Sequence, residues 1–329
     1  MSSVLKAAFG ISRRFQATSS VSSIRNLSSG SRTKSHFNKL LFIGTPVGVA
    51  AGFYLFSQDS PAPVAIEDQP KRVFPINAQE FTSFKIKEIT DLTHDTKLYR
   101  FEIPDSQALL LPVTSCIVTR TPPREGEKAI IRPYTPVSDE RALGYFDLIV
   151  KHYPNGAMTS YLNKLKPGDF LDAKGPFLKY LYKANTLDEI GLIAGGSGIT
   201  PMLQLARKIL NNPKDNTKIS LIFANRTESD IMLKEELDNY VKAYPDRFKV
   251  HYVLDNPPPS WNGGKGHITK DLLKKYLPST ASKDVMVFVC GPMPMVEKIS
   301  GKKRSAQDQG EVGGFLKELG YDKENVYKF

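Results

Sequence analysis

The chain has 329 residues and a formal net charge of +11, which is enough length for about two domains beyond a targeting segment. The charge is unevenly spread: residues 1–58 hold seven basic residues and no Asp or Glu, which leaves 11 − 7 = +4 for the remainder. The basic pI therefore gives no reason to expect a nucleic-acid-binding protein. With only Cys116 and Cys290 present, a disulfide framework is not expected, and no Cys and His spacing typical of a metal site is visible.

The N-terminal 77 residues differ in composition from the rest. Residues 1–39 are rich in Ser, Arg and Lys and lack acids, which is typical of a mitochondrial presequence; a disordered basic tail is the alternative. Residues 40–58 are uncharged and mostly apolar, just long enough to cross a bilayer core of about 30 Å. They predict a transmembrane anchor, with a cleaved signal-like segment as the alternative. Residues 59–77 are polar and proline-rich, which suits an extended linker.

Residues 78–183 carry short runs in which apolar and polar side chains alternate, separated by turn signals. This pattern predicts an antiparallel β-barrel or sandwich, and a barrel is the expected form of this domain. One helix, over 157–165, interrupts the strands. The six strands are expected at 81–89, 96–103, 116–119, 129–131, 144–150 and 169–173.

Residues 184–329 show a different rhythm, in which apolar strands alternate with helical stretches. Strands are expected at 189–193, 219–224, 248–254 and 285–289, with helices over 203–210, near 230–243 and over 268–277. Such alternation predicts an α/β domain with a parallel sheet covered on both faces. Ligands of these sheets bind at the carboxyl ends of the strands.

A glycine turn follows the first strand of this second domain. Gly195, Gly196 and Gly198 provide a turn without Cβ atoms, Thr200 is a suitable N-cap, and Pro201 would then be the first helical residue. Free N–H groups at such a helix start suit a phosphate, although an ordinary tight turn has the same composition.

The segment from Arg132 to Ser138 brings one cation, one aromatic ring and two hydroxyls together. Tyr134 could stack on a planar ring, Thr135 could hydrogen-bond its edge, and the Arg132 guanidinium could hold a phosphate. An ordinary surface strand containing a proline is the alternative. Gly156, just before a helix start, is a second candidate phosphate seat.

Four motifs occur in a fixed order along the chain. R-x-Y-T-x-x-S starts at Arg132, G-x-M-[ST] at Gly156, G-G-x-G-I-T-P-M at Gly195 and C-G-P-x-P-M at Cys290. Together they resemble the NADH–cytochrome b5 reductase branch of the ferredoxin–NADP reductase superfamily, over roughly residues 78–329. The N-terminal segments look like those of the fungal mitochondrial members of this branch.

The resemblance implies a binding role for each matching residue. Thr135, near the flavin N5 edge, and Cys290, against the nicotinamide, would be the catalytic residues. The residues expected to hold FAD are Arg132, Tyr134, Thr135, Ser138, Lys151, Tyr153, Gly156, Met158 and Thr159. Those expected to hold NADH are Gly195, Gly196, Ser197, Gly198, Thr200, Pro201, Met202, Asp230, Cys290, Gly291, Pro292 and Met293.

Two positions bear on the chemistry that the resemblance implies. Cys116 stands where many members of the branch carry a His tied to proton exchange, so the proton path would use Thr135 and water instead. Asp230 matches an acid near the adenosine ribose; a carboxylate there would repel a 2′-phosphate and favour NADH over NADPH. Arg226 nearby weakens that argument, because an Arg can accommodate the phosphate.

The resulting expectation is a membrane-anchored flavoenzyme that takes hydride from NADH onto FAD and passes single electrons to cytochrome b5 or a similar acidic haem protein. The expected location is the mitochondrial outer membrane, with a processed intermembrane-space form as a further product. A reductase of the same fold for a quinone or an ascorbate-type radical, and a non-enzymatic membrane tether that senses NAD(H), are the alternatives. Candidates for a basic patch that attracts an acidic partner are Lys85, Lys87, Lys151, Lys164 and Lys166.

Overall fold

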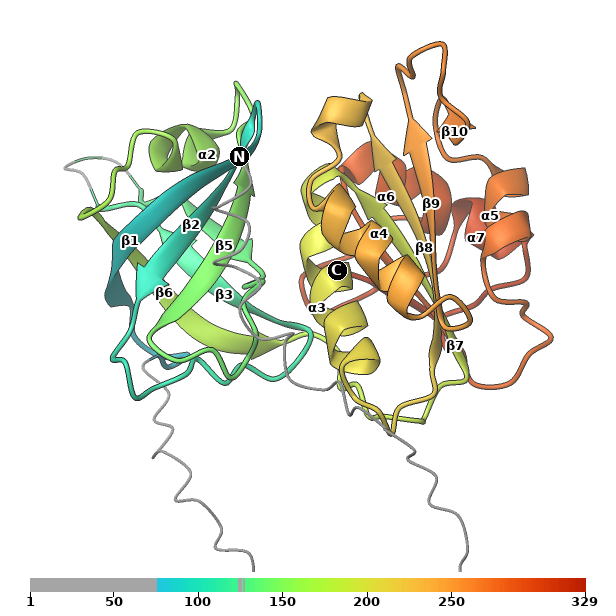
Figure 1. Cartoon of the computed structure of the whole chain (residues 1–329), viewed down its shortest axis with the longest axis horizontal. Coiled ribbons are helices and arrows are strands. Elements are labelled where there is room, and N and C mark those ends of the chain that lie inside the picture. The colour runs from blue at the N-terminus through green and yellow to red at the C-terminus, as the bar shows by residue number, and fades with distance from the viewer. Residues whose placement is uncertain (1–75, 124–125, 127) are drawn as a thin grey trace, which may run out of the picture. The chain divides into compact units, whose positions relative to one another are not determined.

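The computed structural model describes residues 76–123, 126 and 128–329, which form two six-stranded sheets in succession (Figure 1). The expected presequence, the expected membrane anchor and all but the last two residues of the expected linker lie outside the described residues. Within the described residues, no helix combines the length and the apolar character needed to cross a membrane.

The first sheet is antiparallel, as the alternating pattern predicts, with strand order β4-β3-β6-β1-β2-β5. In β1, Phe84 and Ile86 are buried while Ser83, Lys85 and Lys87 are exposed, so one face of the strand packs on a core. The strands are β1 (Thr82–Thr93), β2 (Thr96–Glu102), β3 (Ser115–Arg120), β4 (Ile131–Tyr134), β5 (Tyr145–Lys151) and β6 (Phe170–Leu178).

The two edge strands of this sheet approach each other, because the Val137 N–H, just beyond β4, donates to the Asp147 carbonyl in β5 at 2.9 Å. Tyr99, Phe101 and Phe146 are among the largest buried side chains of its core. Helix α2 (Ala157–Leu162) is shorter than expected: the Asn163 N–H still donates to the Thr159 carbonyl, but the N–H groups of Lys164 and Leu165 donate only three residues back, so the chain turns instead of continuing the helix.

The position of β4 corrects the expected strand at 129–131. The strand begins at Ile131 and includes Arg132, Pro133 and Tyr134. Proline is tolerated there because β4 pairs only with β3 and forms one edge of the sheet, where one side of the strand needs no donor.

The second sheet is parallel, with order β10-β9-β8-β7-β11-β12, which confirms the expected α/β domain. Its central strand, β7, is buried on both faces, as covering helices require. The strands are β7 (Glu189–Gly195), β8 (Lys218–Asn225), β9 (Phe248–Leu254), β10 (Gly264–Lys265), β11 (Val285–Cys290) and β12 (Val326–Lys328). The expected domain boundary at 183/184 falls between β6 and β7.

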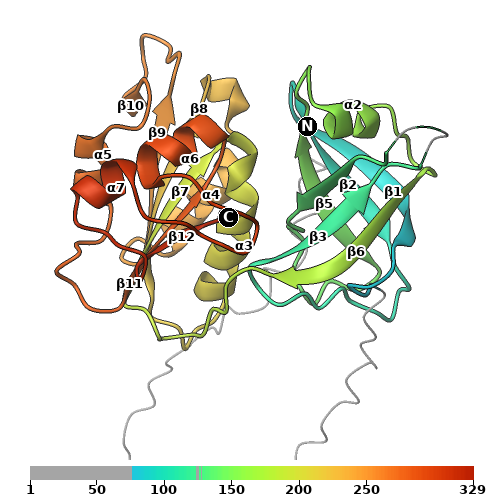
Figure 2. The same cartoon turned by 180° about the vertical axis from the view of Figure 1, so that it is seen from behind.

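Helices cover this sheet on both faces (Figures 1 and 2). On one face, Leu221 and Phe223 of β8 pack with α3 (Ile199–Leu210) and α4 (Lys234–Ala243). On the other face, Ile222 packs with α5 (Lys270–Tyr276), α6 (Met293–Ser300) and α7 (Gly314–Glu318). The carboxyl ends of β7, β8, β9 and β11 therefore meet along one edge of the sheet.

Four of these elements do not follow from the sequence pattern. Strands β10 and β12 have two and three residues, too few to show alternation, and α7 has five residues between glycines. Helix α6 begins within the Cys290–Met295 motif, where Pro294 occupies the second helical position and loses no hydrogen bond.

Candidate active site

The glycine turn lies between β7 and α3 and is itself helical. Gly196–Gly198 form a 3₁₀ turn, Gly196 has a φ of +52°, and α3 then begins at Ile199 with Gly198 as its N-cap. The prediction that Thr200 is the N-cap, with Pro201 as the first helical residue, is wrong. Because the turn is already helical, Thr200 lies inside the helix, and its hydroxyl donates back to the Ser197 carbonyl at 3.2 Å.

The glycine turn and the Cys290 motif meet, because β7 and β11 are adjacent and Ala194 pairs with Cys290. A Cβ on Gly198 would lie 2.3 Å from the Cys290 carbonyl oxygen, and one on Gly195 would lie 2.7 Å from the Met295 sulfur. These two glycines are therefore required by the close packing of the chain on itself. Gly196 is the one whose backbone conformation favours glycine, since the nearest atom to its missing Cβ is 3.6 Å away.

The Cys290 motif supplies a neutral thiol and an exposed thioether. Burial raises the pKa of the Cys290 thiol to about 12, so the sulfur stays protonated at neutral pH. Met293 begins α6 and is exposed. The thiol therefore offers a small apolar surface and no thiolate nucleophile.

The Arg132 motif lies on β4 and in the segment after it. Arg132 is exposed, and its guanidinium donates only to the neighbouring Ile131 carbonyl, with no acidic partner among the described residues. Tyr134 is half-buried, and burial raises the pKa of its hydroxyl to about 12, so the ring is neutral. Ser138 accepts a hydrogen bond from the Asp147 N–H at 3.2 Å, which fixes the end of the segment on β5.

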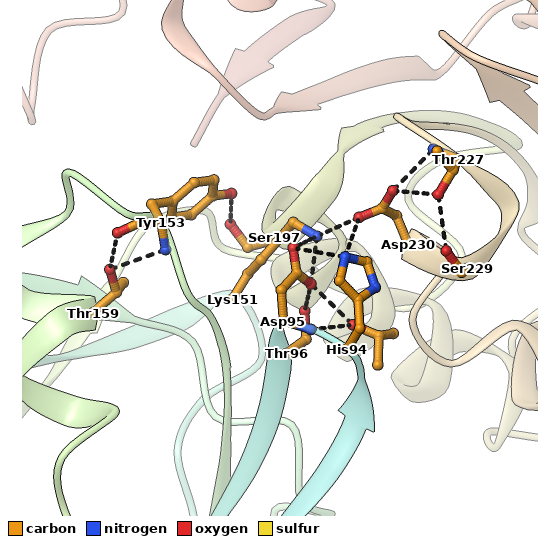
Figure 3. Close-up of polar contacts among 11 residues, drawn as sticks. His94, Asp95, Thr96, Lys151, Tyr153, Thr159, Ser197, Thr227, Ser229 and Asp230 are labelled. Atoms are coloured by element: carbon orange, nitrogen blue, oxygen red, sulfur yellow. Dashed lines mark hydrogen bonds and ion pairs between the residues drawn. The ribbon is translucent and has the colours of Figure 1, made fainter.

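The Gly156 loop is closed on its own residues. The Thr159 hydroxyl accepts from the Tyr153 N–H at 3.2 Å and contacts the Gly156 carbonyl at 3.0 Å. The Met158 side chain is buried in the core of the first sheet, so only its backbone could reach a cofactor. Tyr153 is exposed, and its hydroxyl lies 3.2 Å from the Ser197 hydroxyl of the glycine turn (Figure 3).

Lys151 and Asp230, expected on different cofactors, are bonded to each other. The Lys151 ammonium lies 2.9 Å from Asp230 Oδ1, and both side chains are buried (Figure 3). Asp230 Oδ2 accepts from the N–H and the hydroxyl of Thr227, so both of its oxygens are engaged. Its expected contact with a ribose stays a prediction, whereas Lys151 does not belong to an exposed basic patch.

Helix α3 also holds the segment after β4. Gln204 accepts from the Thr114 N–H at 2.5 Å and donates to the Pro136 carbonyl at 3.3 Å. Arg207 donates to the Val137 carbonyl and forms a two-pronged ion pair with buried Glu236 at 2.6 and 2.7 Å. One helix thus carries the glycine turn at its start and anchors the segment that contains Thr135.

Two polar residues at the carboxyl edge of the second sheet were not singled out from the sequence. Asp255 directly follows β9, is exposed, and lies 3.7 Å from His267 Nε2. Asn225 ends β8 and is buried, yet neither polar atom of its side chain has a hydrogen-bond partner in the structure. The available signal was their position directly after or at the end of a strand, where α/β sheets bind ligands.

The residues present fit both cofactors. The Arg132 guanidinium, which has no acidic partner among the described residues, suits a pyrophosphate, and the unpaired Asn225 amide at the edge where ligands bind suits a polar group of a nucleotide. The helical run begins at the 3₁₀ turn, so the N–H groups of Gly196, Ser197 and Gly198 are the ones that have no preceding helical carbonyl, whereas the Ile199 N–H already donates to the Gly196 and Ser197 carbonyls.

Comparisons with known proteins define the class. Residues 83–182 match the oxidoreductase FAD-binding domain family and residues 192–301 match the oxidoreductase NAD-binding domain family. Among solved structures, the cytochrome b5 reductase domain of Ulva prolifera nitrate reductase aligns with a TM-score of 0.68 and 31% identity, over 77% of this chain and 99% of that one. The CS-b5R domains of human Ncb5or (NAD+ form) align with a TM-score of 0.62 and 29% identity, over 76% of this chain and 69% of that one.

Curated fungal proteins are more similar still. NADH-cytochrome b5 reductase 2 of Botryotinia fuckeliana is 53% identical over 260 residues, which cover 79% of this chain and 75% of that protein. The protein of the same name from Coccidioides immitis is 46% identical over 310 residues, which cover 93% of this chain and 95% of that protein. The chain therefore belongs to the NADH-cytochrome b5 reductase family, which confirms the resemblance seen in the four motifs.

Proposed function

We propose that the protein takes hydride from NADH onto FAD and passes the electrons singly to cytochrome b5 or a similar acidic haem protein. The contact between Tyr153 and Ser197 carries the proposal, because it joins the motif expected to hold FAD to the turn expected to hold NADH. Ligands held by these two motifs would have their reactive rings side by side, as hydride transfer requires.

The chain's own residues then bind and orient. Arg132 would hold the FAD pyrophosphate, Tyr134 would lie along the flavin ring, and the N–H groups of the Gly196–Gly198 turn would hold the nicotinamide nucleotide. The neutral Cys290 thiol would pack against the nicotinamide without reacting with it. FAD, when bound, supplies the redox chemistry by accepting hydride and releasing electrons one at a time.

Anaerobic visible spectroscopy of the full-length chain, reconstituted with FAD in detergent, tests this proposal. Rapid bleaching of the flavin band by NADH, followed by recovery on addition of oxidised cytochrome b5, is the expected result. A chain that cannot be loaded with FAD would contradict the enzymatic function. NADH could also bleach the flavin without reoxidation by the haem protein. If a quinone or an ascorbate-type radical then reoxidised the flavin, that molecule would be assigned as the acceptor.

The preference for NADH rests on an acid at the carboxyl edge of the second sheet. Asp255 is the better placed of the two candidates, since it is exposed, whereas both Asp230 oxygens are engaged within the chain. An acid at this edge binds a ribose hydroxyl and repels a 2′-phosphate. Asp255→Ser should lower the ratio of flavin reduction rates with NADH and NADPH; a lowered ratio in Asp230→Asn alone would assign the role to Asp230.

Four lysines form a candidate docking patch: Lys85, Lys87, Lys164 and Lys166 are all exposed. Backbone bonds of 2.8 Å, Ile86 N–H to the Asp169 carbonyl and Gly168 N–H to the Ile86 carbonyl, bring the loop after α2 beside β1. Changing all four to Glu should slow cytochrome b5 reduction about tenfold or more at low salt and leave reduction of a small neutral acceptor unchanged. The control is the same change at Lys242, Lys249, Lys283 and Lys323, which are also exposed.

The location follows from the N-terminal sequence. The acid-free basic segment 1–39 and the uncharged segment 40–58 support import to the mitochondrion and a single-pass anchor in its outer membrane, with a processed intermembrane-space form. Alkaline extraction of isolated mitochondria should leave an uncleaved form in the membrane fraction. A protein released entirely by alkali with its first residue still Met1 would contradict both the anchor and the processing.

A further inference from the structure

Lys151, the last residue of β5, is the centre of a three-residue ion-paired cluster, which we call the Lys151 bridge. Its ammonium contacts Asp95 Oδ1 at 2.7 Å, in the turn between β1 and β2, and Asp230 Oδ1 at 2.9 Å, after β8 (Figure 3). The bridge therefore joins the antiparallel sheet to a segment of the parallel-sheet domain.

Each carboxylate of the bridge is fixed by hydrogen bonds from residues close to it in the sequence. Asp95 Oδ1 accepts from the hydroxyls of Thr93 and Thr96 at 3.0 and 2.9 Å. Asp230 Oδ2 accepts from the N–H of Thr227 at 2.9 Å, in a capping box at the start of the 3₁₀ turn Glu228–Asp230. Two carboxylates fixed in this way determine where the ammonium lies.

The charges of the bridge depend on one another. Burial acts to raise the pKa of both carboxyl groups, but hydrogen bonds from Lys151 and the threonines outweigh burial, and both pKa values lie below their ordinary value. Burial acts to lower the pKa of Lys151, and its bonds to Asp95 and Asp230 raise the pKa above the ordinary value. Removing one partner leaves a charge in a site where the Lys151 and Asp230 side chains are only 9% and 7% exposed.

The bridge lies next to the contact between the two cofactor motifs. Tyr153, whose hydroxyl reaches Ser197, is two residues beyond Lys151, and the intervening His152 N–H donates to the Asp95 carbonyl at 2.7 Å. The same turn therefore holds this strand end through both Lys151 and His152. The Lys151 ammonium also lies 2.6 Å from Asp95 Oδ2, so it contacts both oxygens of Asp95 and one oxygen of Asp230.

A metal ion is not needed to explain the carboxylates. His94, Asp95 and Asp230 place ligand atoms within 4.8 Å of one another, but the Lys151 ammonium already contacts both carboxylates. His94 is exposed at the rim, with Nε2 3.7 Å from Asp95 and 3.9 Å from Asp230. The positive charge between the two acids is the chain's own.

We infer that Asp95 and Asp230 are positioning residues: through Lys151 they hold the end of β5 against the glycine turn and so set the distance between flavin and nicotinamide. This inference rests on the proposed function. It assigns to Asp230 an effect on the hydride-transfer rate without contact with NADH. Because a misplacement of about 1 Å can slow a reaction roughly a hundredfold, loss of the bridge should appear in the rate of transfer.

The test uses the full-length chain loaded with FAD and the variants Asp230→Asn and Asp95→Asn. Stopped-flow measurement of flavin bleaching should show a limiting rate about tenfold to a hundredfold lower, with FAD content unchanged and half-saturation by NADH nearly unchanged. Asp230→Glu, which keeps the charge, should recover part of the rate. Asp172→Asn is the matched control, since Asp172 pairs with Arg120 within the first sheet at 2.9 Å and should leave the rate unchanged.

Hydrogen–deuterium exchange supplies a readout that does not depend on turnover. Residues 93–97 and 196–200 should exchange faster in Asp230→Asn than in the wild type, and Asp172→Asn should not change them. A wild-type rate and unchanged exchange in Asp230→Asn would overturn the inference. A rise in the NADH concentration needed for half-saturation, with the limiting rate unchanged, would also overturn it. If the wild type failed to react with NADH while exchange changed as expected, the proposed function would fail and the bridge would stand.

Discussion

The two sheets offer their cofactor motifs in opposite ways. On the antiparallel sheet, Arg132 lies on an exposed edge strand, so its side chain is available to a ligand. On the parallel sheet, Gly198, Thr200 and Met202 are buried, so the motif offers mainly the backbone groups of the Gly196–Gly198 turn. Substitutions in the first motif should therefore change ligand binding, and those in the second should change stability.

The variant with the largest expected effect, Arg207→Met, tests whether the stability of the chain depends on contacts between α3 and the segment after β4. Arg207→Met removes the guanidinium that pairs with Glu236 and donates to the Val137 carbonyl. Because it leaves a buried carboxylate unpaired, we expect a loss of about 3–5 kcal/mol in the free energy of unfolding. Denaturant unfolding followed by far-UV circular dichroism measures this. If the free energy of unfolding fell by less than about 1 kcal/mol, the contacts of Arg207 with Glu236 and the Val137 carbonyl would contribute little to stability.

Gly198→Ala should sharpen the contrast on the parallel-sheet side. The new Cβ would lie 2.3 Å from the Cys290 carbonyl oxygen, a backbone atom that cannot move aside easily. We expect a loss of about 3 kcal/mol, at the upper end of ordinary overpacking. Gly196→Ala is the matched control: it meets no close atom and adds only about 1 kcal/mol of left-handed strain. Equal losses in the two variants would contradict the packing argument.

Arg132→Ala should show the opposite behaviour on the antiparallel side. The side chain is exposed and has no acidic partner among the described residues, so the melting temperature of the FAD-free protein should not change. Loss of a charge-assisted contact to a pyrophosphate should weaken FAD binding about 10- to 100-fold. Fluorescence titration with FAD measures this, and Arg132→Lys should recover part of the affinity. Unchanged FAD affinity would remove Arg132 from the site.

The smallest expected effect is a pH dependence of stability within the parallel-sheet domain. His251 in β9 stacks on Tyr276, and burial, with repulsion from Lys275 and Lys249, lowers the pKa of its imidazole to about 4. The unfolded chain binds this proton near pH 6.5, so stability should fall as pH decreases from about 6.5 to about 4. With solvent screening, the loss is on the order of 1 kcal/mol. His251→Phe should flatten this part of the plot of melting temperature against pH. If the plot for the variant ran parallel to that of the wild type, His251 would be excluded as the source of the pH dependence.

Sequence patterns predicted the elements that depend on local spacing. Alternation predicted β1 from Phe84 and Ile86, because a strand with one buried face has a period of two. The start of α3 was misplaced, since whether a threonine caps a helix depends on the conformation of the residues before it. The pairing of Lys151 with Asp230 could not be predicted, because the residues are 79 positions apart and meet only when both sheets have formed.

Helix α3 has a consequence for how such proteins diverge and can be recombined. Gln204 and Arg207 hold the Pro136 and Val137 carbonyls, next to Thr135, while the same helix begins at the glycine turn. Residues 113–114, 136–140 and 204–208 should therefore vary together among relatives. Consider a chimera that joins the first sheet of one relative to the second sheet of another. The residues at 204 and 207 of α3 should then have to come from the same parent as the segment after β4 that they contact.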